Sequence, residues 1–284
     1  MEMVPRRRVM VVIASAIVLL TSSVATFSVI SHKPSHPPIS IVGDLSFIQE
    51  NGIVQGDGSP QDPYVIEGWD IKAPSNGSGI YIRDTSAHLL VRNVDIHSND
   101  SAWFGVCLEY AKNVTFKNVK MTGNWNGIRM DYCRDVTIER CDASSNLYGG
   151  IEISRSENIS VTESRAADNH LHNLEVWSTN TCNISGNEFR PGDEKWRAWD
   201  NLVDLRQSPN ATFSFNVMNG CYLQISNCTS CNLAQNEFSD TCIWFAESSS
   251  GAFMENEMTH GSYLDGNYTG FTFDRDYPPG PPGV

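Results

Sequence analysis

Apolar and polar residues alternate along this chain in short runs that return at a nearly regular interval. Each unit holds two such runs, and a glycine or an asparagine precedes the first run in the clearest copies. The first apolar anchors of successive units lie 20 to 29 residues apart, at Ile80, Val106, Ile128, Ile151, Leu174, Val203, Leu223 and Ile243. A repeat of this length with two short strands per unit indicates a solenoid rather than a globular sheet.

Two further columns of apolar residues follow the anchors. Residues two apart on a strand share a face, so the position two residues after each anchor faces the same core. These positions hold Ile82, Leu108, Met130, Ile153, Val176, Leu205, Ile225 and Phe245. The second strand of each unit adds Val91, Phe116, Ile138, Val161, Ile184, Phe213, Leu233 and Phe253. Every position in the three columns is apolar, which predicts one continuous core.

Asparagines recur at one turn of the later units. Asn187, Asn216, Asn236 and Asn256 each lie three residues after the last apolar column. Stacked side-chain amides can bond to one another as a ladder. Coils of about 22 residues whose strands stack at ~4.8 Å describe a parallel β-helix, so the predicted fold class is all-β.

The repeats resemble the right-handed parallel β-helix repeat, and the stretch from Asn51 to Ile71 is similar to the capping segment of archaeal NosD-like proteins. The resemblance covers roughly residues 41–258. It implies a single-stranded right-handed parallel β-helix of about eight coils with an N-terminal cap. Because the family name refers to periplasmic copper-site maturation, the resemblance also implies an accessory role at a metal site as one alternative.

The first thirty residues predict export. Arg6–Arg8 precede an uncharged run, Val9–Ile30, whose 22 residues could span a bilayer with the following chain outside. A cleaved signal peptide with its cleavage site at Ser23–Ala25 is the alternative. We therefore expect a β-helix attached to the cell membrane by a single N-terminal span or, if the segment is removed, a secreted one.

The predicted organisation has four parts. Residues 1–30 form the anchor or signal peptide, and residues 31–40 form a proline-rich spacer. Residues 41–258 form the capped β-helix, and residues 259–284 form a C-terminal cap with a proline-rich tail. Eight glycosylation sequons agree with an extracellular glycoprotein: Asn76, Asn99, Asn113, Asn158, Asn183, Asn210, Asn227 and Asn267.

Charge and cysteine content limit the partners and cofactors that can be expected for this chain. The net charge is −13 and the sequence shows no basic stripe, so nucleic acid is not an expected partner. We expect a monomer without a cofactor. Among the eight cysteines, Cys141, Cys182 and Cys231 fall at inward positions, Cys221 and Cys242 could meet between coils, and the pair Cys228 and Cys231 is a weak metal or redox motif.

Charged residues gather on the outward face of the first strands, near the middle of the repeat. Strand neighbours in successive coils lie ~5 Å apart, which is within the range of carboxylate separations that glycosidases use. The candidate catalytic residues are Asp131, Glu152, Glu175, Asp204, Arg129 and Arg206, and Glu109 is a further acidic residue for ligand binding. The paired aspartates and the Gly-His-Gly of pectin-degrading hydrolases are not found, which favours binding over catalysis.

Aromatic residues accompany these charges. Planar rings beside carboxylates and amides are typical of surfaces that bind sugars. The candidate ligand-binding aromatics are Trp103, Trp125, Tyr148, Trp177, Trp196 and Trp199. The sequence therefore predicts a carbohydrate-binding protein, with a polysaccharide lyase or glycoside hydrolase, a structural surface spacer and a NosD-like accessory protein as alternatives. His170 and His172 are the weak candidates for metal ligands.

Overall fold

The computed structural model describes residues 32–98, 102–191, 202–246, 249–267 and 269–278. The described residues from Lys33 onward belong to one compact unit. The expected anchor or signal segment lies outside the described residues. Among the residues that are described, no helix is long and apolar enough to cross a membrane.

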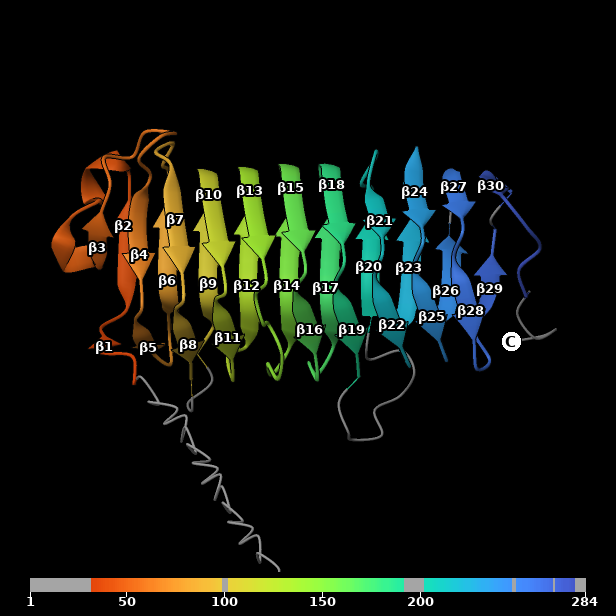
Figure 1. Ribbon diagram of the computed structural model, residues 1–284, viewed down its shortest axis with the longest axis horizontal. Coiled ribbons are helices and arrows are strands. Elements are labelled where there is room, and N and C mark those ends of the chain that lie inside the picture. The colour runs from red at the N-terminus through yellow and green to blue at the C-terminus, as the bar shows by residue number, and fades with distance from the viewer. Residues whose placement is uncertain (1–31, 99–101, 192–201, 247–248, 268, 279–284) are drawn as a thin grey trace, which may run out of the picture. The chain divides into compact units, whose positions relative to one another are not determined.

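The compact unit is a parallel β-solenoid whose strands form four sheets along three sides (Figure 1). The first sheet has ten parallel strands, one from each successive coil. They are β2 (Ile39–Val42), β6 (Ser78–Arg83), β9 (Phe104–Glu109), β12 (Asn126–Asp131), β14 (Gly149–Ser154), β17 (His172–Trp177), β20 (Leu202–Arg206), β23 (Tyr222–Ser226), β26 (Cys242–Ala246) and β29 (Tyr263–Gly266).

The second sheet has eleven strands and is parallel except for the antiparallel pair β3 and β4 at its start. Its strands are β3 (Ile53–Gln55), β4 (Tyr64–Glu67), β7 (Leu89–Arg92), β10 (Lys112–Lys117), β13 (Arg134–Glu139), β15 (Glu157–Thr162), β18 (Asn180–Ser185), β21 (Thr212–Ser214), β24 (Cys231–Ala234), β27 (Gly251–Met254) and β30 (Phe271–Phe273).

A third side of short strands was not predicted from the sequence. Its first part holds β1 (Ser35–His36), β5 (Asp70–Lys72), β8 (Asp95–His97) and β11 (Lys120–Thr122). Its second part holds β16 (Arg165–Ala167), β19 (Glu188–Arg190), β22 (Val217–Asn219), β25 (Glu237–Ser239) and β28 (Glu257–Thr259). Single bridges through Asp142 join the two parts, so each central coil is three-sided.

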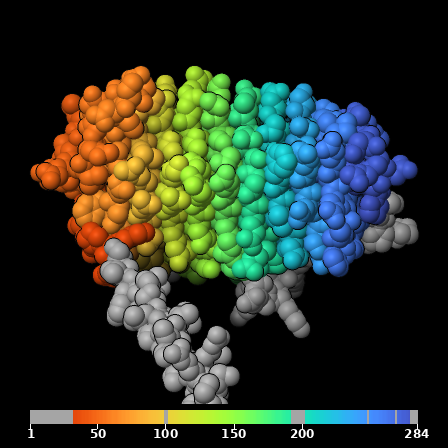
Figure 2. Space-filling view, in the orientation of Figure 1, coloured from red at the N-terminus to blue at the C-terminus, as the bar shows by residue number. Residues whose placement is uncertain are grey.

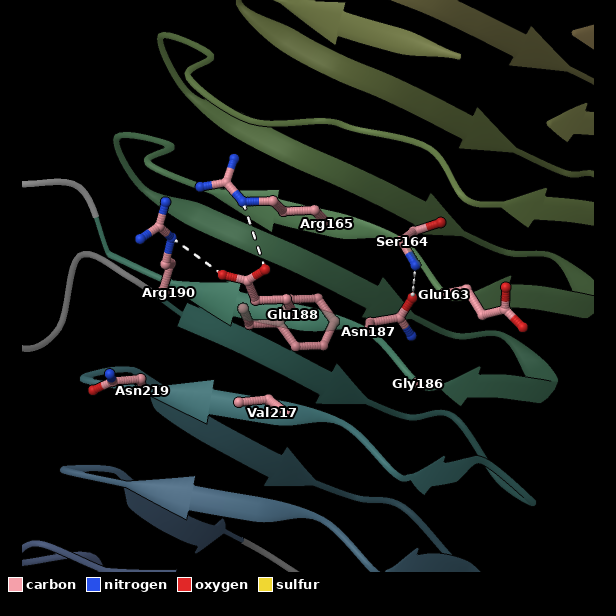
Figure 3. Close-up of a pocket in the computed structure, with 10 residues that line it drawn as sticks. Glu163, Ser164, Arg165, Gly186, Asn187, Glu188, Arg190, Val217 and Asn219 are labelled. Atoms are coloured by element: carbon pink, nitrogen blue, oxygen red, sulfur yellow. Dashed lines mark hydrogen bonds and ion pairs between the residues drawn. The ribbon is translucent and has the colours of Figure 1, made fainter. Parts of the chain in front are cut away.

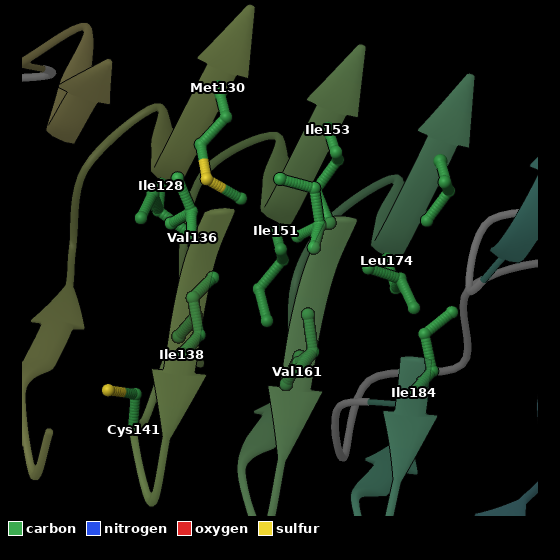
Figure 4. Close-up of a cluster of buried hydrophobic side chains, with 14 of the residues drawn as sticks. Ile128, Met130, Val136, Ile138, Cys141, Ile151, Ile153, Val161, Leu174 and Ile184 are labelled. Atoms are coloured by element: carbon green, nitrogen blue, oxygen red, sulfur yellow. The ribbon is translucent and has the colours of Figure 1, made fainter. Parts of the chain in front are cut away.

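The strand register confirms the predicted apolar columns. Val106, Ile128 and Ile151 are partners in neighbouring strands, and the column continues through Leu174, Val203, Leu223 and Ile243. All of these side chains are buried. Figure 4 shows like side chains from successive coils stacked above one another inside the solenoid. The fold is therefore the all-β solenoid that the repeat predicts, with about eight regular coils.

Buried amides stack as predicted, and a second ladder accompanies them. The Asn187 side chain donates to Asn216 Oδ1 at 3.0 Å, and Asn216 donates to Asn236 Oδ1 at 3.1 Å. A second ladder in the earlier coils includes the bond from Asn146 Nδ2 to Asn169 Oδ1 at 3.1 Å. These bonds satisfy the turn amides that would otherwise be buried without partners.

The two ends of the solenoid are covered. Short 3₁₀ helices η1 (Asp44–Ser46) and η2 (Gln49–Asn51) form part of the N-terminal cap. At the other end, the Leu264 amide donates to the Pro278 carbonyl and the Tyr277 ring packs edge-on against Phe253. Figure 2 shows the coils as successive narrow bands between these ends. Coverage of terminal strands is what a stacked repeat requires for solubility.

Candidate functional site

The outward side of the first sheet brings the predicted charged residues together. Arg129 on β12, Glu152 on β14 and Glu175 on β17 are register partners, and Asp204 on β20 continues the column. Asp131 and Arg206 lie at the neighbouring outward position of the same strands. We call this surface the first-sheet face. Its residues come from coils far apart in sequence because parallel stacking aligns the same position of each coil.

Exposed aromatic side chains concentrate at the two ends of these strands. Six aromatic side chains are strongly exposed among the described residues: Trp103, Tyr110, Trp125, Tyr132, Trp177 and Phe215. The first five immediately precede, follow or end strands of the first-sheet face. We call the row at the start of the strands the entry rim (Trp103, Trp125, Tyr148 and His172) and the row at their end the exit rim (Tyr110, Tyr132, Arg155 and Trp177).

The entry rim is held by ring contacts between coils. The rings of Trp125 and Tyr148 stack with centroids 5.3 Å apart, and His172 meets Tyr148 edge-on at 4.9 Å. Burial raises the pKa of Tyr148, and the charges of Glu175 and Glu152 act in the same direction. The central carboxylates of the face therefore influence the ionisation of the Tyr148 hydroxyl.

The exit rim is an aromatic and guanidinium stack. The rings of Tyr110 and Tyr132 are parallel at 4.9 Å, and the Arg155 guanidinium lies over Tyr132 at 4.7 Å and over Trp177 at 5.2 Å. Tyr110, Tyr132 and Arg155 all have left-handed backbone conformations, with φ from 46° to 54°. This turn ends each strand in the same way, so equivalent side chains project side by side.

The predicted aromatic stripe is thus divided between the two rims. Trp177 ends β17, whereas Tyr148 lies before β14, so a strand of six residues, about 20 Å long, separates the two rows. Trp196 and Trp199 lie outside the described residues. The arrangement is a polar strip with aromatic rings along both borders.

Two acidic residues near the exit rim are bound by side chains of the same face. Arg155 binds Asp131 through Nε at 2.8 Å and Nη2 at 2.6 Å, and the Ser154 hydroxyl donates to the same carboxylate at 2.9 Å. Glu109 accepts a hydrogen bond from the Tyr81 hydroxyl at 2.8 Å and lies 3.7 Å from Arg83. These contacts give Asp131 and Glu109 a role in holding the exit rim.

The central carboxylates are in unusual environments. Burial raises the pKa of Asp204 to about 7, since its side chain is 1% exposed; Arg206 opposes this shift, and the nearby charge of Glu175 adds to it. Burial also raises the pKa of Glu152, aided by Glu175 and Asp131 and opposed by Arg129. Raised carboxyl pKa values in a cluster mark a candidate functional site.

His172 belongs to this cluster rather than to a group of metal ligands. Its Nε2 atom lies 3.6 Å from Glu175 Oε2 and has no hydrogen-bond partner among the described residues. Burial lowers the pKa of His172, so the imidazole is neutral at pH 7. The predicted neighbour Cys182 is buried inside the core, and within the described residues no three His, Cys, Asp or Glu side chains come together as metal ligands.

The cysteines form no disulfide: all eight are described, and all are free. Cys141, Cys182 and Cys231 are buried at the predicted inward positions. Burial raises the pKa of Cys182 to about 12, as expected for a thiol in an apolar core. Cys141, Cys182 and Cys231 therefore act here as small core residues.

A separate hollow lies on the third side of the solenoid. It has a volume of about 520 Å³ and is lined by Arg165, Glu188 and Arg190 among others (Figure 3). Arg165 and Arg190 both turn to Glu188, with N–O distances of 3.8 and 3.3 Å. Because these charges already pair with one another, the hollow is a weaker candidate than the first-sheet face.

Sequence reasoning missed several members of the face. Tyr110, Tyr132 and Arg155 each follow the last residue of a first-sheet strand, so a column drawn one position further would have found them. Asn126 was also missed; its Nδ2 donates to Glu152 Oε2 at 2.7 Å, whereas its buried Oδ1 has no partner among the described residues.

Comparison with known proteins assigns the fold to a family. The profile described as right-handed β-helix region matches residues 43–189, which is more than half of the chain. The chain belongs to the right-handed β-helix family. No curated protein sequence matches it.

Two solved structures of this architecture are similar to the chain. An alginate lyase from Paenibacillus sp. FPU-7 has a TM-score of 0.50 and 10% identity, over 83% of this chain and 99% of the lyase. The tailspike protein gp49 from Acinetobacter baumannii bacteriophage Fri1, a capsular polysaccharide depolymerase, has a TM-score of 0.51 and 12% identity. That match covers 80% of this chain and 52% of the tailspike chain. At these identities the likeness shows the fold alone.

Proposed function

We propose that this β-helix binds an extended carbohydrate on the first-sheet face. The observation that carries the proposal is the pair of aromatic rims along a strip of carboxylates, amides and guanidinium groups. Five of the six strongly exposed aromatic side chains among the described residues lie in these rims. Sugar rings offer C–H faces that pack on aromatic planes and hydroxyls that bond to polar groups.

The charge of the face favours a neutral glycan. Arg83, Arg129, Arg155 and Arg206 each lie within 4.0 Å of a carboxylate on the same face. A uronate would have to compete with these existing ion pairs for a cation. Of the structural relatives named above, one is an alginate lyase and the other a capsular polysaccharide depolymerase, which supports a carbohydrate ligand of some class.

The N-terminal sequence supports a location for the proposed function. A membrane span or a signal peptide in residues 1–30 would place the β-helix outside the cell, where it would meet surface or extracellular glycans. We propose that it acts there as a monomer, without nucleic acid.

The NosD-like resemblance offers the competing proposal of an accessory role at a copper site. His170 and His172 would have to supply imidazole ligands for it. A copper titration, monitored through the imidazole resonances of these two residues, separates the proposals. The copper-site proposal expects these resonances to change, whereas the carbohydrate proposal expects no effect of copper on glycan binding.

The test is direct binding of the purified full chain to β-1,3-, β-1,4- and α-1,4-linked glucans, a galactomannan and alginate. We expect binding to at least one neutral glycan. Trp125→Ala should weaken it by about 2- to 13-fold, since an aromatic contact contributes about 0.5–1.5 kcal/mol.

Phe215→Ala is the matched control, because Phe215 is an exposed aromatic residue outside both rims. It should bind like the wild type. Absence of binding to every neutral glycan, or equal losses in the two variants, would refute the proposed function.

A further inference from the structure

Two carboxyl groups on the first-sheet face are accessible and adjacent. Glu152 and Glu175 are register partners on the neighbouring strands β14 and β17, whose spacing is about 4.8 Å. Their side chains are 22% and 23% exposed, whereas the next carboxyl in the column, Asp204, is 1% exposed. Glu152 and Glu175 are therefore the members of this column that a bound ligand can touch.

The two carboxyl groups have different partners. Glu152 accepts a hydrogen bond from Asn126 Nδ2 at 2.7 Å and lies 3.4 Å from Arg129 Nε. Burial raises its pKa, which favours the protonated form. Glu175 is instead bound by the Arg206 guanidinium at 2.7 Å, and the same guanidinium lies 2.6 Å from Asp204. One carboxyl is thus disposed to donate a proton and the other is held in an ion pair.

Unsatisfied buried atoms next to the pair point independently to a ligand. Asn126, Gly149 and His172 follow one another in a column beside the two glutamates. Asn126 and His172 are more than nine-tenths buried, yet Asn126 Oδ1 and His172 Nε2 have no hydrogen-bond partner among the described residues. Leaving such an atom unpaired costs about 1–3 kcal/mol, so sites of this kind suit a ligand that brings donors.

Gly149 allows this arrangement. A Cβ atom at this position would lie 2.6 Å from His172 Nε2 and 3.4 Å from Asn126 Nδ2. The missing side chain lets the imidazole lie against the strand, with its free nitrogen toward Glu175. The glycine, the amide and the imidazole together set the approach to the carboxyl pair.

We propose that Glu152 and Glu175 hydrolyse a glycosidic bond of a neutral glycan bound on the first-sheet face, with retention of anomeric configuration. The inference rests on the proposed function and adds a reaction to it. Carboxyl groups about 5–5.5 Å apart suit the retaining route, whereas the inverting route needs about 6.5–9.5 Å. The backbone spacing of adjacent strands, about 4.8 Å, lies next to the first of these ranges and well below the second.

The proposed hydrolysis has two steps, and water is the only reactant that it needs besides the glycan. In the first step Glu152 gives its proton to the glycosidic oxygen, the bond from that oxygen to the anomeric carbon breaks, and the Glu175 carboxylate bonds to the same carbon. In the second step water attacks the anomeric carbon, the Glu152 carboxylate takes the water proton, and the ester bond to Glu175 breaks. Arg206, Asn126 and His172 act as positioning residues.

The experiment measures new reducing ends when the full chain is incubated with the neutral glycan that it binds. Glu152→Gln and Glu175→Gln should each lower turnover about 100-fold or more while binding is kept, because each removes a proton carrier or nucleophile without changing shape. Glu139→Gln, on the second sheet, is the matched control and should turn over like the wild type. Thermal melts followed by circular dichroism check that the variants are folded.

A covalent probe gives a measurement that would show no reaction if Glu175 had a purely structural role. A 2-fluoro glycoside should add one sugar mass to Glu175, and azide should restore turnover to Glu175→Gly with release of a glycosyl azide. Binding without new reducing ends would overturn this inference and leave the proposed function standing. Loss of binding to every neutral glycan would overturn both.

Discussion

The outward faces of the first and second sheets are built by the same coils, yet they carry different chemistry. One outward column of the second sheet is made mostly of small residues, in the register Leu90, Thr115, Thr137, Ser160, Asn183, Thr212, Asn232 and Ala252. Its hydroxyls and amides bond between coils, as Thr212 does to Asn183 at 2.9 Å. No strongly exposed aromatic residue of the described chain lies in this column.

The comparison shows what the repeat itself requires. Stacking demands β-prone residues and paired polar groups on any outward face, and the second sheet meets that demand with hydroxyls, amides and ion pairs such as that of Lys117 with Glu139. The first sheet adds exposed rings, a carboxyl that is 1% exposed and unpaired polar atoms. Phe215 after β21 and Arg92 Nε on β7 are isolated examples on the second sheet, whereas these features gather on the first-sheet face, which ligand binding explains better than the fold does.

The largest expected effect is common to both sheets and lies inside them. Ile151→Asp on the first sheet and Val161→Asp on the second each bury an unpaired charge, which costs several kcal/mol. Chemical denaturation should show a similar, severe loss of stability for both. A large loss in one variant only would mean that the two sheets differ in their cores as well as on their faces.

A fall of stability with rising pH should come from the first sheet, whereas the lowered pKa values of Glu67 and Glu139 on the second sheet act in the opposite direction. Because the pKa of Asp204 is raised to about 7, the folded protein holds a proton that the unfolded chain releases near pH 4. Stability should therefore fall as pH rises from about 4 to about 7, with a slope of at most ~1.4 kcal/mol per pH unit from this group. Asp204→Asn should flatten this slope in urea titrations at successive pH values, and an unchanged slope would show that Asp204 is not its source.

The exit rim should contribute to binding on its own. Trp177→Ala removes a ring that packs with Arg155, and we expect glycan affinity to fall by about 1 kcal/mol, or roughly 5-fold. Titration calorimetry with the bound neutral glycan measures this change. An unchanged affinity would restrict the binding surface to the entry rim.

The smallest effect should come from the second-sheet face. Thr137→Ala changes an outward position without a core contact, so stability should shift by no more than about 0.5 kcal/mol and glycan affinity should stay the same. A drop in affinity would show that the second sheet also contacts the ligand, and the contrast between the two faces would fail.

Much of the fold could be predicted because inward positions obey a strict rule. Ile128 and Val161 occupy columns in which only apolar residues occur, and a two-residue period places them without knowledge of the turns. The third side was missed because strands of three residues show a single inward side chain. Its signal was an apolar residue two positions after the turn asparagine, as Phe189 follows Asn187.

The site was predicted in part for a similar reason. Alternation along a strand correctly placed Glu152, Glu175 and Asp204 in one outward column. The exit rim depends instead on left-handed turn residues such as Tyr132, whose side-chain direction follows from the turn and not from the strand period. The burial of Asp204 depends on neighbours from other coils, which no single stretch of sequence reveals.

Hydroxyl-radical footprinting of the full chain, with and without a bound neutral glycan, tests the central claim most directly. Exposed aromatic side chains are oxidised readily, and a ligand that covers them slows the reaction. The account predicts that the glycan protects Trp125, Tyr132 and Trp177 in the two rims and leaves Phe215 unprotected. Protection of Phe215 with the rims still reactive would contradict it.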